Sequence, residues 1–214
     1  YPDWIKGIAC ALGSAGLAFL YSGDMIAFIV TVICSLIGYF GRTLSVRFGC
    51  NEYVGIAIGG FAAMVSAYGF YSHIEQASLV YVLVCCTLFM IPGVPLINSV
   101  IDTINNHILS GITRAIRTIL IVGSMTLGMA MALYFNPMPA FSFVDIKPYV
   151  LSIEQIIGSF IAAASFAVLF NAPVRLLVSI GIGGVLCVFT RNLLAVEFGF
   201  SIPGATFVGA AVMS

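Results

Sequence analysis

The sequence predicts an all-α, polytopic membrane protein with about eight transmembrane helices, and three observations lead to this prediction. Of its 214 residues, 61% are hydrophobic and only 7% are charged, with a mean hydropathy of +1.15. Soluble domains carry roughly 25% charged residues. Apolar runs of a length that can cross a bilayer core of roughly 30 Å recur along the chain. Finally, the two ends of the chain carry a matching pattern, which indicates an internal repeat.

Eight apolar runs are candidate spans, and short polar connections separate the first four. They cover residues 4–21, 25–47, 53–72, 78–91, 111–135, 154–171 and 173–194, with a last one that starts near residue 202. The longest connection is rich in proline and is the best boundary in the chain. We expect a first five-helix transmembrane repeat over residues 1–136, a linker over 137–152, and the start of a second repeat over 153–214.

The repeat becomes visible when the chain is shifted by 149 residues, which places residues 17–44 on 166–193 without a gap. Six of these 28 positions are identical, including the charged pair Arg42 and Arg191. The same shift places Gly60 on Gly209, and a slip of one residue places Phe48-Gly49 on Phe198-Gly199. An odd number of predicted spans, five, separates equivalent positions, so the second copy must cross the membrane in the opposite direction. Inverted repeats of this kind frame many secondary transporters.

The sequence has no initiator Met, and it stops within an apolar run. We therefore expect a fragment of a longer protein, with the second copy of the repeat truncated.

The fourth apolar run predicts a broken helix. From Ser78 to Ile91 it has 14 residues, which is about 21 Å of helix and too short to cross the bilayer. It ends in the sequence Ile91-Pro92-Gly93-Val94-Pro95, where two prolines lack a backbone N–H and glycine permits unusual dihedral angles. A break at membrane depth is tolerated only where it faces protein or a wet cavity. Such interrupted segments are the best sequence indicator of a transporter site.

Polar side chains recur at helical spacing just beyond this break. Ser99, Thr103, Asn106, Ser110 and Arg114 share one face, beside a stripe of Asn98, Asp102 and Asn105. We interpret this face as a substrate-binding surface; the alternative is a cytoplasmic helix whose polar face lies in water. The predicted substrate-binding residues are Pro92, Gly93, Pro95, Asn98, Ser99, Asp102, Asn105, Asn106, Ser110 and Arg114. Asp102 and His107 are predicted proton carriers, because His titrates near physiological pH and intramembrane carboxylates often relay protons.

The distribution of Lys and Arg favours a cytoplasmic N-terminus. In that orientation Lys147 and Arg191 fall outside, and six residues fall at cytoplasmic ends: Lys6, Arg42, Arg47, Arg114, Arg117 and Arg175. Catalytic motifs and Cys/His sets with metal-ligand spacing are missing from the sequence. We therefore expect no enzyme activity, no metal and no cofactor, and the zero net charge gives no reason to expect a nucleic-acid partner.

The residues from Ile91 to Asn98, followed by Asp102, Asn106 and Ser110-Gly111, resemble the hallmark of the threonine/serine exporter family. The opening residues 1–24 and two later segments, 170–175 and 204–207, also look like parts of this family. The resemblance implies a proton-motive-force-driven exporter of threonine and serine in a bacterial inner membrane. It also implies a small-molecule substrate, contact with lipids, and either a homo-oligomer or a partner second half. Carried over by position, the family's motif residues here are Pro92, Gly93, Pro95, Asn98 and Asp102.

Two other functions stay open. A dicarboxylate exporter is suggested because paired-subunit members of the family are associated with succinate, and because Arg114 and His107 would suit a second carboxylate. A membrane scaffold or assembly subunit without transport activity is the alternative of another class, and it predicts no polar cavity around residues 92–110.

Overall fold

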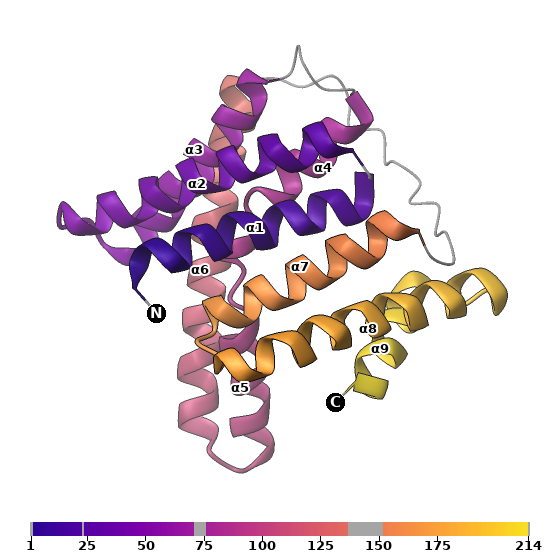
Figure 1. The fold of residues 1–214 in the computed structure, drawn as a ribbon. Coiled ribbons are helices and arrows are strands. Elements are labelled where there is room, and N and C mark those ends of the chain that lie inside the picture. Colours follow the sequence, from indigo (N-terminus) through magenta and orange to yellow (C-terminus); the bar gives the residue numbers. More distant parts are fainter. Residues whose placement is uncertain (1, 23, 71–75, 137–151, 214) are drawn as a thin grey trace.

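The computed structural model describes residues 2–22, 24–70, 76–136 and 152–213, and all regular elements in these ranges are helices (Figure 1). They are α1 Asp3–Ser22, α2 Met25–Arg47, α3 Glu52–Gly69, α4 Gln76–Cys85, the 3-10 turn η2 Leu88–Met90, α5 Gly93–Ile104, α6 Ile108–Phe135, α7 Ile153–Leu169, the 3-10 turn η3 Val174–Leu176, α8 Leu177–Glu197 and α9 Ile202–Met213. The predicted all-α class is therefore confirmed for the described ranges. The linker predicted over 137–152 lies almost entirely outside them.

Local chemistry sets several helix ends. Asp24 caps α2 by accepting the N–H of Ile26 at 2.9 Å, and Asn51 caps α3 by accepting that of Tyr53 at 3.2 Å. Such caps satisfy backbone donors that have no partner within the helix. Beyond the ends of α2 and α8, Gly49 and Gly199 have φ of 90° and 64°, a left-handed conformation that glycine adopts without steric cost.

The helices pack through small residues. α1 lies between α2 and α7, and α8 lies on the other side of α7 (Figure 1). A side chain at Gly16 of α1 would lie 2.8 Å from the backbone nitrogen of Ala162 in α7. On the other side of the molecule, Gly128 of α6 lies directly against the backbone of Ala57 in α3. Close backbone approach through small residues is typical of helix packing in membranes.

Four helical segments are long and apolar enough to cross a membrane, and the bent pair of residues 79–90 and 93–104 would make a fifth span. The four are Asp3–Tyr21, Met25–Arg47, Ile108–Phe135 and Val174–Glu197, while α7 and α9 are apolar but shorter. α6 and α8 also expose large apolar side chains such as Ile119 and Val178, at 68% and 61%. A membrane protein fits these surfaces, whereas the count of eight spans stays a prediction.

The helix bounds at the two ends of the chain correspond. Adding 149 to the bounds of α1 (3–22) gives 152–171, where α7 spans 153–169. Adding 149 to those of α2 (25–47) gives 174–196, where η3 and α8 span 174–197. The first residue of α3 requires 150 rather than 149, because 52 + 150 = 202, the first residue of α9.

The contacts of α9 correct one detail of the predicted alignment. A side chain at Gly59 would lie 2.8 Å from the carbonyl oxygen of Gly38, and one at Gly209 would lie 2.9 Å from that of Cys187. Since 38 + 149 = 187, Gly209 occupies the place of Gly59. The predicted pairing of Gly209 with Gly60 is therefore shifted by one residue from the pairing that these contacts give, because η3 and α8 together span one residue more than α2.

Candidate substrate cavity and the broken helix

The predicted helix break is present. α4 ends at Cys85, a 3-10 turn follows, and α5 begins at Gly93. The two segments on either side of Pro92 are bent by 52° relative to each other. Pro92 has φ of −81° and ψ of 61°, outside the α-helical region, and it has no N–H to donate to the preceding turn. The first helix thus ends before the Pro-Gly sequence, and the second helix begins at this sequence within the same apolar segment.

The predicted polar face lies on a hairpin made by α5 and the first half of α6. Asp102 is its centre: its Oδ2 accepts a hydrogen bond from Ser110 Oγ at 2.8 Å and pairs with Arg114 Nε at 3.3 Å. Asn106 makes the turn with φ of 61°, a left-handed value that asparagine tolerates better than most residues. The structure thus brings Asp102, Ser110 and Arg114 together, as residues that pair with one another.

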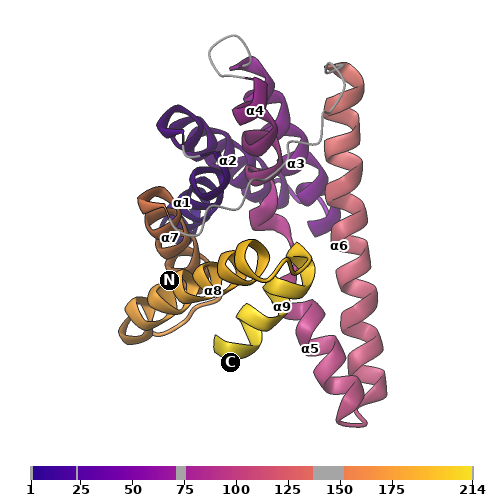
Figure 2. The same cartoon turned by 90° about the vertical axis from the view of Figure 1, so that its right-hand side faces the viewer.

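The other predicted site residues are arranged differently. Ser99 is buried and donates its hydroxyl to the carbonyl of Leu96 at 2.7 Å. Asn105, Asn106 and His107 have exposed side chains, and Asn98 is half-buried. The hairpin extends away from α1, α2 and α7 (Figure 2). The structure therefore does not gather the predicted residues around one pocket with the second half of the chain.

A cavity of about 660 Å³ lies beside the break instead. Its walls come from α1, α2, the start of α3, the segment before Pro92 and the C-terminal end of α7, so both ends of the chain contribute. The apolar part is Val46, Phe89, Ile91, Phe166, Leu169 and Phe170; the polar part is Asp3, Lys6, Tyr39, Arg42, Thr43, Arg47 and Glu52. An apolar pocket with a few convergent polar groups is the usual form of a small-molecule site.

The charges of this cavity are mostly paired. Glu52 accepts from two arginines, Arg42 at 3.4 Å and Arg117 of α6 at 3.0 Å. Arg47 pairs with Asp3 at 3.2 Å. The remaining cation, Lys6, forms no ion pair with the described residues. The lining carries three cations against two carboxylates, which leaves one positive charge for an anionic ligand.

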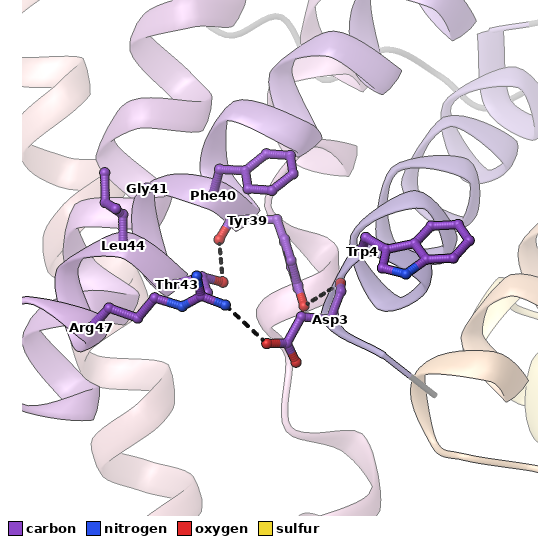
Figure 3. Close-up of a pocket in the computed structure, with 8 residues that line it drawn as sticks. All are labelled: Asp3, Trp4, Tyr39, Phe40, Gly41, Thr43, Leu44 and Arg47. Carbon is purple, nitrogen blue, oxygen red and sulfur yellow. Dashed lines mark hydrogen bonds and ion pairs between the residues drawn. The ribbon is translucent and has the colours of Figure 1, made fainter.

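A second hollow of about 540 Å³ adjoins this cavity and shares four of its residues, Asp3, Tyr39, Thr43 and Arg47 (Figure 3). Here the hydroxyl of Tyr39 donates to the backbone carbonyl of Asp3 at 3.1 Å. Together with the pair of Arg47 and Asp3, this bond ties the start of α1 to the last turns of α2. It fixes the wall of the cavity on the side of the N-terminus.

The sequence predicts Lys6, Arg42 and Arg47 at the cytoplasmic ends of spans, and it gives no sign that they line a cavity with Glu52. One signal could have indicated otherwise. Arg42 lies five residues before the end of α2, within an apolar run, and ionisable residues inside a span usually have a partner and a function. Among the described residues, no group of three or more His, Cys, Asp or Glu side chains could hold a metal ion.

Comparison with known proteins defines the class of this helical protein with its broken span and charged cavity. Residues 1–136 match the family model described as "Putative threonine/serine exporter", and residues 155–214 match a second one, "Threonine/Serine exporter, ThrE". The chain belongs to the threonine/serine exporter family.

A similar curated protein is the "Probable succinate transporter subunit YjjP" of Klebsiella aerogenes, 26% identical over 141 residues. The match covers 62% of this chain and 52% of that protein, so the chain spans about half of its length. No solved structure matches the chain.

Proposed function

We propose that this chain is the membrane part of a secondary exporter of small hydrophilic metabolites that carry a carboxylate, with threonine and serine as the first candidates. The observation that carries the proposal is the cavity beside the helix break, whose lining has one surplus positive charge and comes from both ends of the chain. A ligand carboxylate would face Lys6, and the ligand's apolar part would face Phe89 and Phe170. The family to which the chain belongs supports export.

The proposal includes an inverted repeat, in which α7, α8 and α9 repeat α1, α2 and α3. The contact between α1 and α7 supports it. A side chain at Gly13 would lie 3.3 Å from Cβ of Ser165, and one at Gly16 would lie 2.8 Å from the nitrogen of Ala162. Subtracting 149 from 165 and 162 gives 16 and 13. The contact between residues 13 and 165 therefore joins the same two equivalent positions as the contact between 16 and 162, with the two helices exchanged. Such reciprocity is typical of a two-fold axis.

The direction of this axis follows from the helices. Positions 13 and 16 of α1 face positions 165 and 162 of α7, so the two helices are antiparallel. A two-fold axis that relates antiparallel neighbours is perpendicular to both, and for membrane-crossing helices it lies in the plane of the membrane. This geometry is that of inverted-repeat transporters, whose substrate site lies at the repeat interface. The two family models, which match residues 1–136 and 155–214, also support a division near the predicted linker.

Proton coupling is the second part of the proposal, with Asp102 and His107 as the carriers. Asp102 has a side chain that is 20% exposed and holds Ser110 and Arg114, so its protonation would release both. The ten residues predicted from Pro92 to Arg114 remain the proposed path of substrate and protons through the hairpin. We further propose that the chain lies in the inner membrane with a cytoplasmic N-terminus and works as a homo-oligomer or with a partner second half.

Succinate is the second candidate substrate. The relative described above is named as a succinate transporter subunit, and the unpaired Lys6 of the cavity could face one carboxylate of a dicarboxylate. Efflux of labelled threonine, serine and succinate from proteoliposomes, with and without a pH gradient, tests both candidates. We expect gradient-dependent release of at least one of them, and Lys6→Gln should slow it. A chain that releases none of them under any gradient would support the scaffold alternative.

A further inference from the structure

The second half of the chain holds an arginine in a network of amides. Arg191 of α8 donates to Oδ1 of Asn192 from both Nε, at 3.2 Å, and a terminal guanidinium nitrogen, at 3.1 Å. Asn192 is only 1% exposed, and its Nδ2 donates to Oε1 of Gln155 in α7 at 3.0 Å. A buried amide bonded on both sides cannot turn freely, so it fixes the direction of the guanidinium.

The positive charge of Arg191 is not neutralised within the described part of the chain. The four ion pairs found there involve Arg42, Arg47, Arg114 and Arg117. Arg191 lies six residues before the end of α8 (197 − 191 = 6), which is about 9 Å inside this candidate span. A cation at such a position is costly and usually has a counter-ion or lines a polar cavity.

The first half of the chain has an arginine at the corresponding position and gives it a carboxylate. Arg42 corresponds to Arg191 (42 + 149 = 191), and it pairs with Glu52, the first residue of α3, at 3.4 Å. The first residue of α9 is Ile202, so the later copy keeps the guanidinium and lacks the carboxylate. Gln155 corresponds to Lys6 (6 + 149 = 155). The first half therefore has a cation at both positions, Lys6 and Arg42, whereas the second half has a cation only at the second of these positions, Arg191.

We propose that Arg191 binds a carboxylate of the transported metabolite at the first turn of α9, where Glu52 lies against Arg42 in the first half. This inference rests on the proposed function and names a second contact for its substrate. Because α1 and α7 are antiparallel, the cluster around Arg191 lies at the opposite end of this helix pair from the cavity around Lys6. The substrate carboxylate would then have a cation at each end of this helix pair.

Substitutions at residue 202 test the proposal directly. Ile202→Glu supplies an internal carboxylate at the position of Glu52, so it should occupy Arg191 and weaken binding of succinate or L-threonine at least tenfold. Ile202→Gln has a side chain of nearly the same size without the charge and should bind like the parent chain. Arg191→Gln should weaken binding as Ile202→Glu does. Titration calorimetry in detergent measures the affinity of the parent chain and of the three variants. The diamide of succinate and threonine amide, which lack a carboxylate, are the control ligands.

The outcomes separate the two proposals. Efflux by the parent chain tests the proposed function alone. Suppose that the parent chain transports and binds the ligand. If Ile202→Glu and Arg191→Gln then both bind it with the affinity of the parent chain, the ligand carboxylate does not reach Arg191 and the inference is overturned. Asp145→Asn removes a carboxylate outside the described residues. Tighter ligand binding by this variant would mean that Asp145 already occupies Arg191, which also overturns the inference; unchanged binding supports it. A cooperative melting transition of each variant without ligand shows that the variants are folded.

Discussion

Replacing Glu52 by Gln should convert the cavity into a stronger anion site. The substitution keeps the size of the side chain and removes the carboxylate shared by Arg42 and Arg117, at 3.4 and 3.0 Å. The charge of the cavity lining then rises from +1 to +2 (three cations and two carboxylates before, one carboxylate after). An additional cation about 4 Å from a bound carboxylate contributes about 1 kcal/mol even at the dielectric constant of water. Succinate should therefore bind about fivefold more tightly.

The cost in stability should be modest. The side chains of Glu52, Arg42 and Arg117 are 39%, 32% and 58% exposed, and ion pairs with this exposure contribute at most about 1 kcal/mol each. Titration calorimetry of succinate, with a melting curve for each variant, measures both effects. Glu154→Gln, an exposed carboxylate on α7 outside the cavity lining, is the matched control and should bind like the parent chain. Weaker or unchanged succinate binding by a folded Glu52→Gln variant would refute this account of the cavity charge.

Three further predictions concern the helix interface, the hairpin and the unpaired lysine. Gly16→Leu should destabilise the chain by about 1–3 kcal/mol, because the atoms nearest to the added group are backbone atoms of α7, which cannot turn aside. The control is Gly123→Leu, which has open space around it and should leave the melting temperature nearly unchanged. Asp102→Asn should abolish pH-gradient-driven efflux at unchanged abundance, and full efflux by this variant would remove Asp102 from the mechanism. Lys6→Gln should weaken succinate binding by the same fivefold or more in calorimetry, whereas equal affinity would place the carboxylate elsewhere.

The sequence was sufficient to predict features that local chemistry decides. Pro92 cannot donate a backbone hydrogen bond and Gly93 permits unusual dihedral angles, so a break near them could be predicted from a few neighbouring residues. Its start could not, because α4 already ends at Cys85. The apolar composition likewise required helices with apolar outer faces. The polar stripe was predicted on one continuous helix, and this detail is wrong, because α5 ends at Ile104 and α6 begins at Ile108. The pairing of Asp102 with Ser110 and Arg114 depends on the turn at Asn106 between these two helices, which the helical spacing does not reveal.

The cavity could not be predicted because its residues are distant in sequence. Lys6 and Phe170 line the same space although 164 positions separate them (170 − 6 = 164), and only the contact between α1 and α7 brings them together. A lysine or arginine near the end of an apolar run is far more often a membrane anchor than a ligand-binding group. The repeat match between Arg42 and Arg191 was visible, whereas the different partners of these two residues require the three-dimensional structure.

We propose that the two ends of this chain form oppositely oriented halves around one cavity, and labelling of residues 48 and 198 tests this arrangement. Both follow the last residue of corresponding helices, α2 and α8, and both are well exposed, at 80% and 65%. In a cysteine-free background, Phe48→Cys and Phe198→Cys are labelled with a membrane-impermeant maleimide added to one side of sealed vesicles. If the halves are oppositely oriented, the reagent will reach the two positions from opposite sides of the vesicle membrane. Labelling of both positions from the same side would show that the halves have the same orientation.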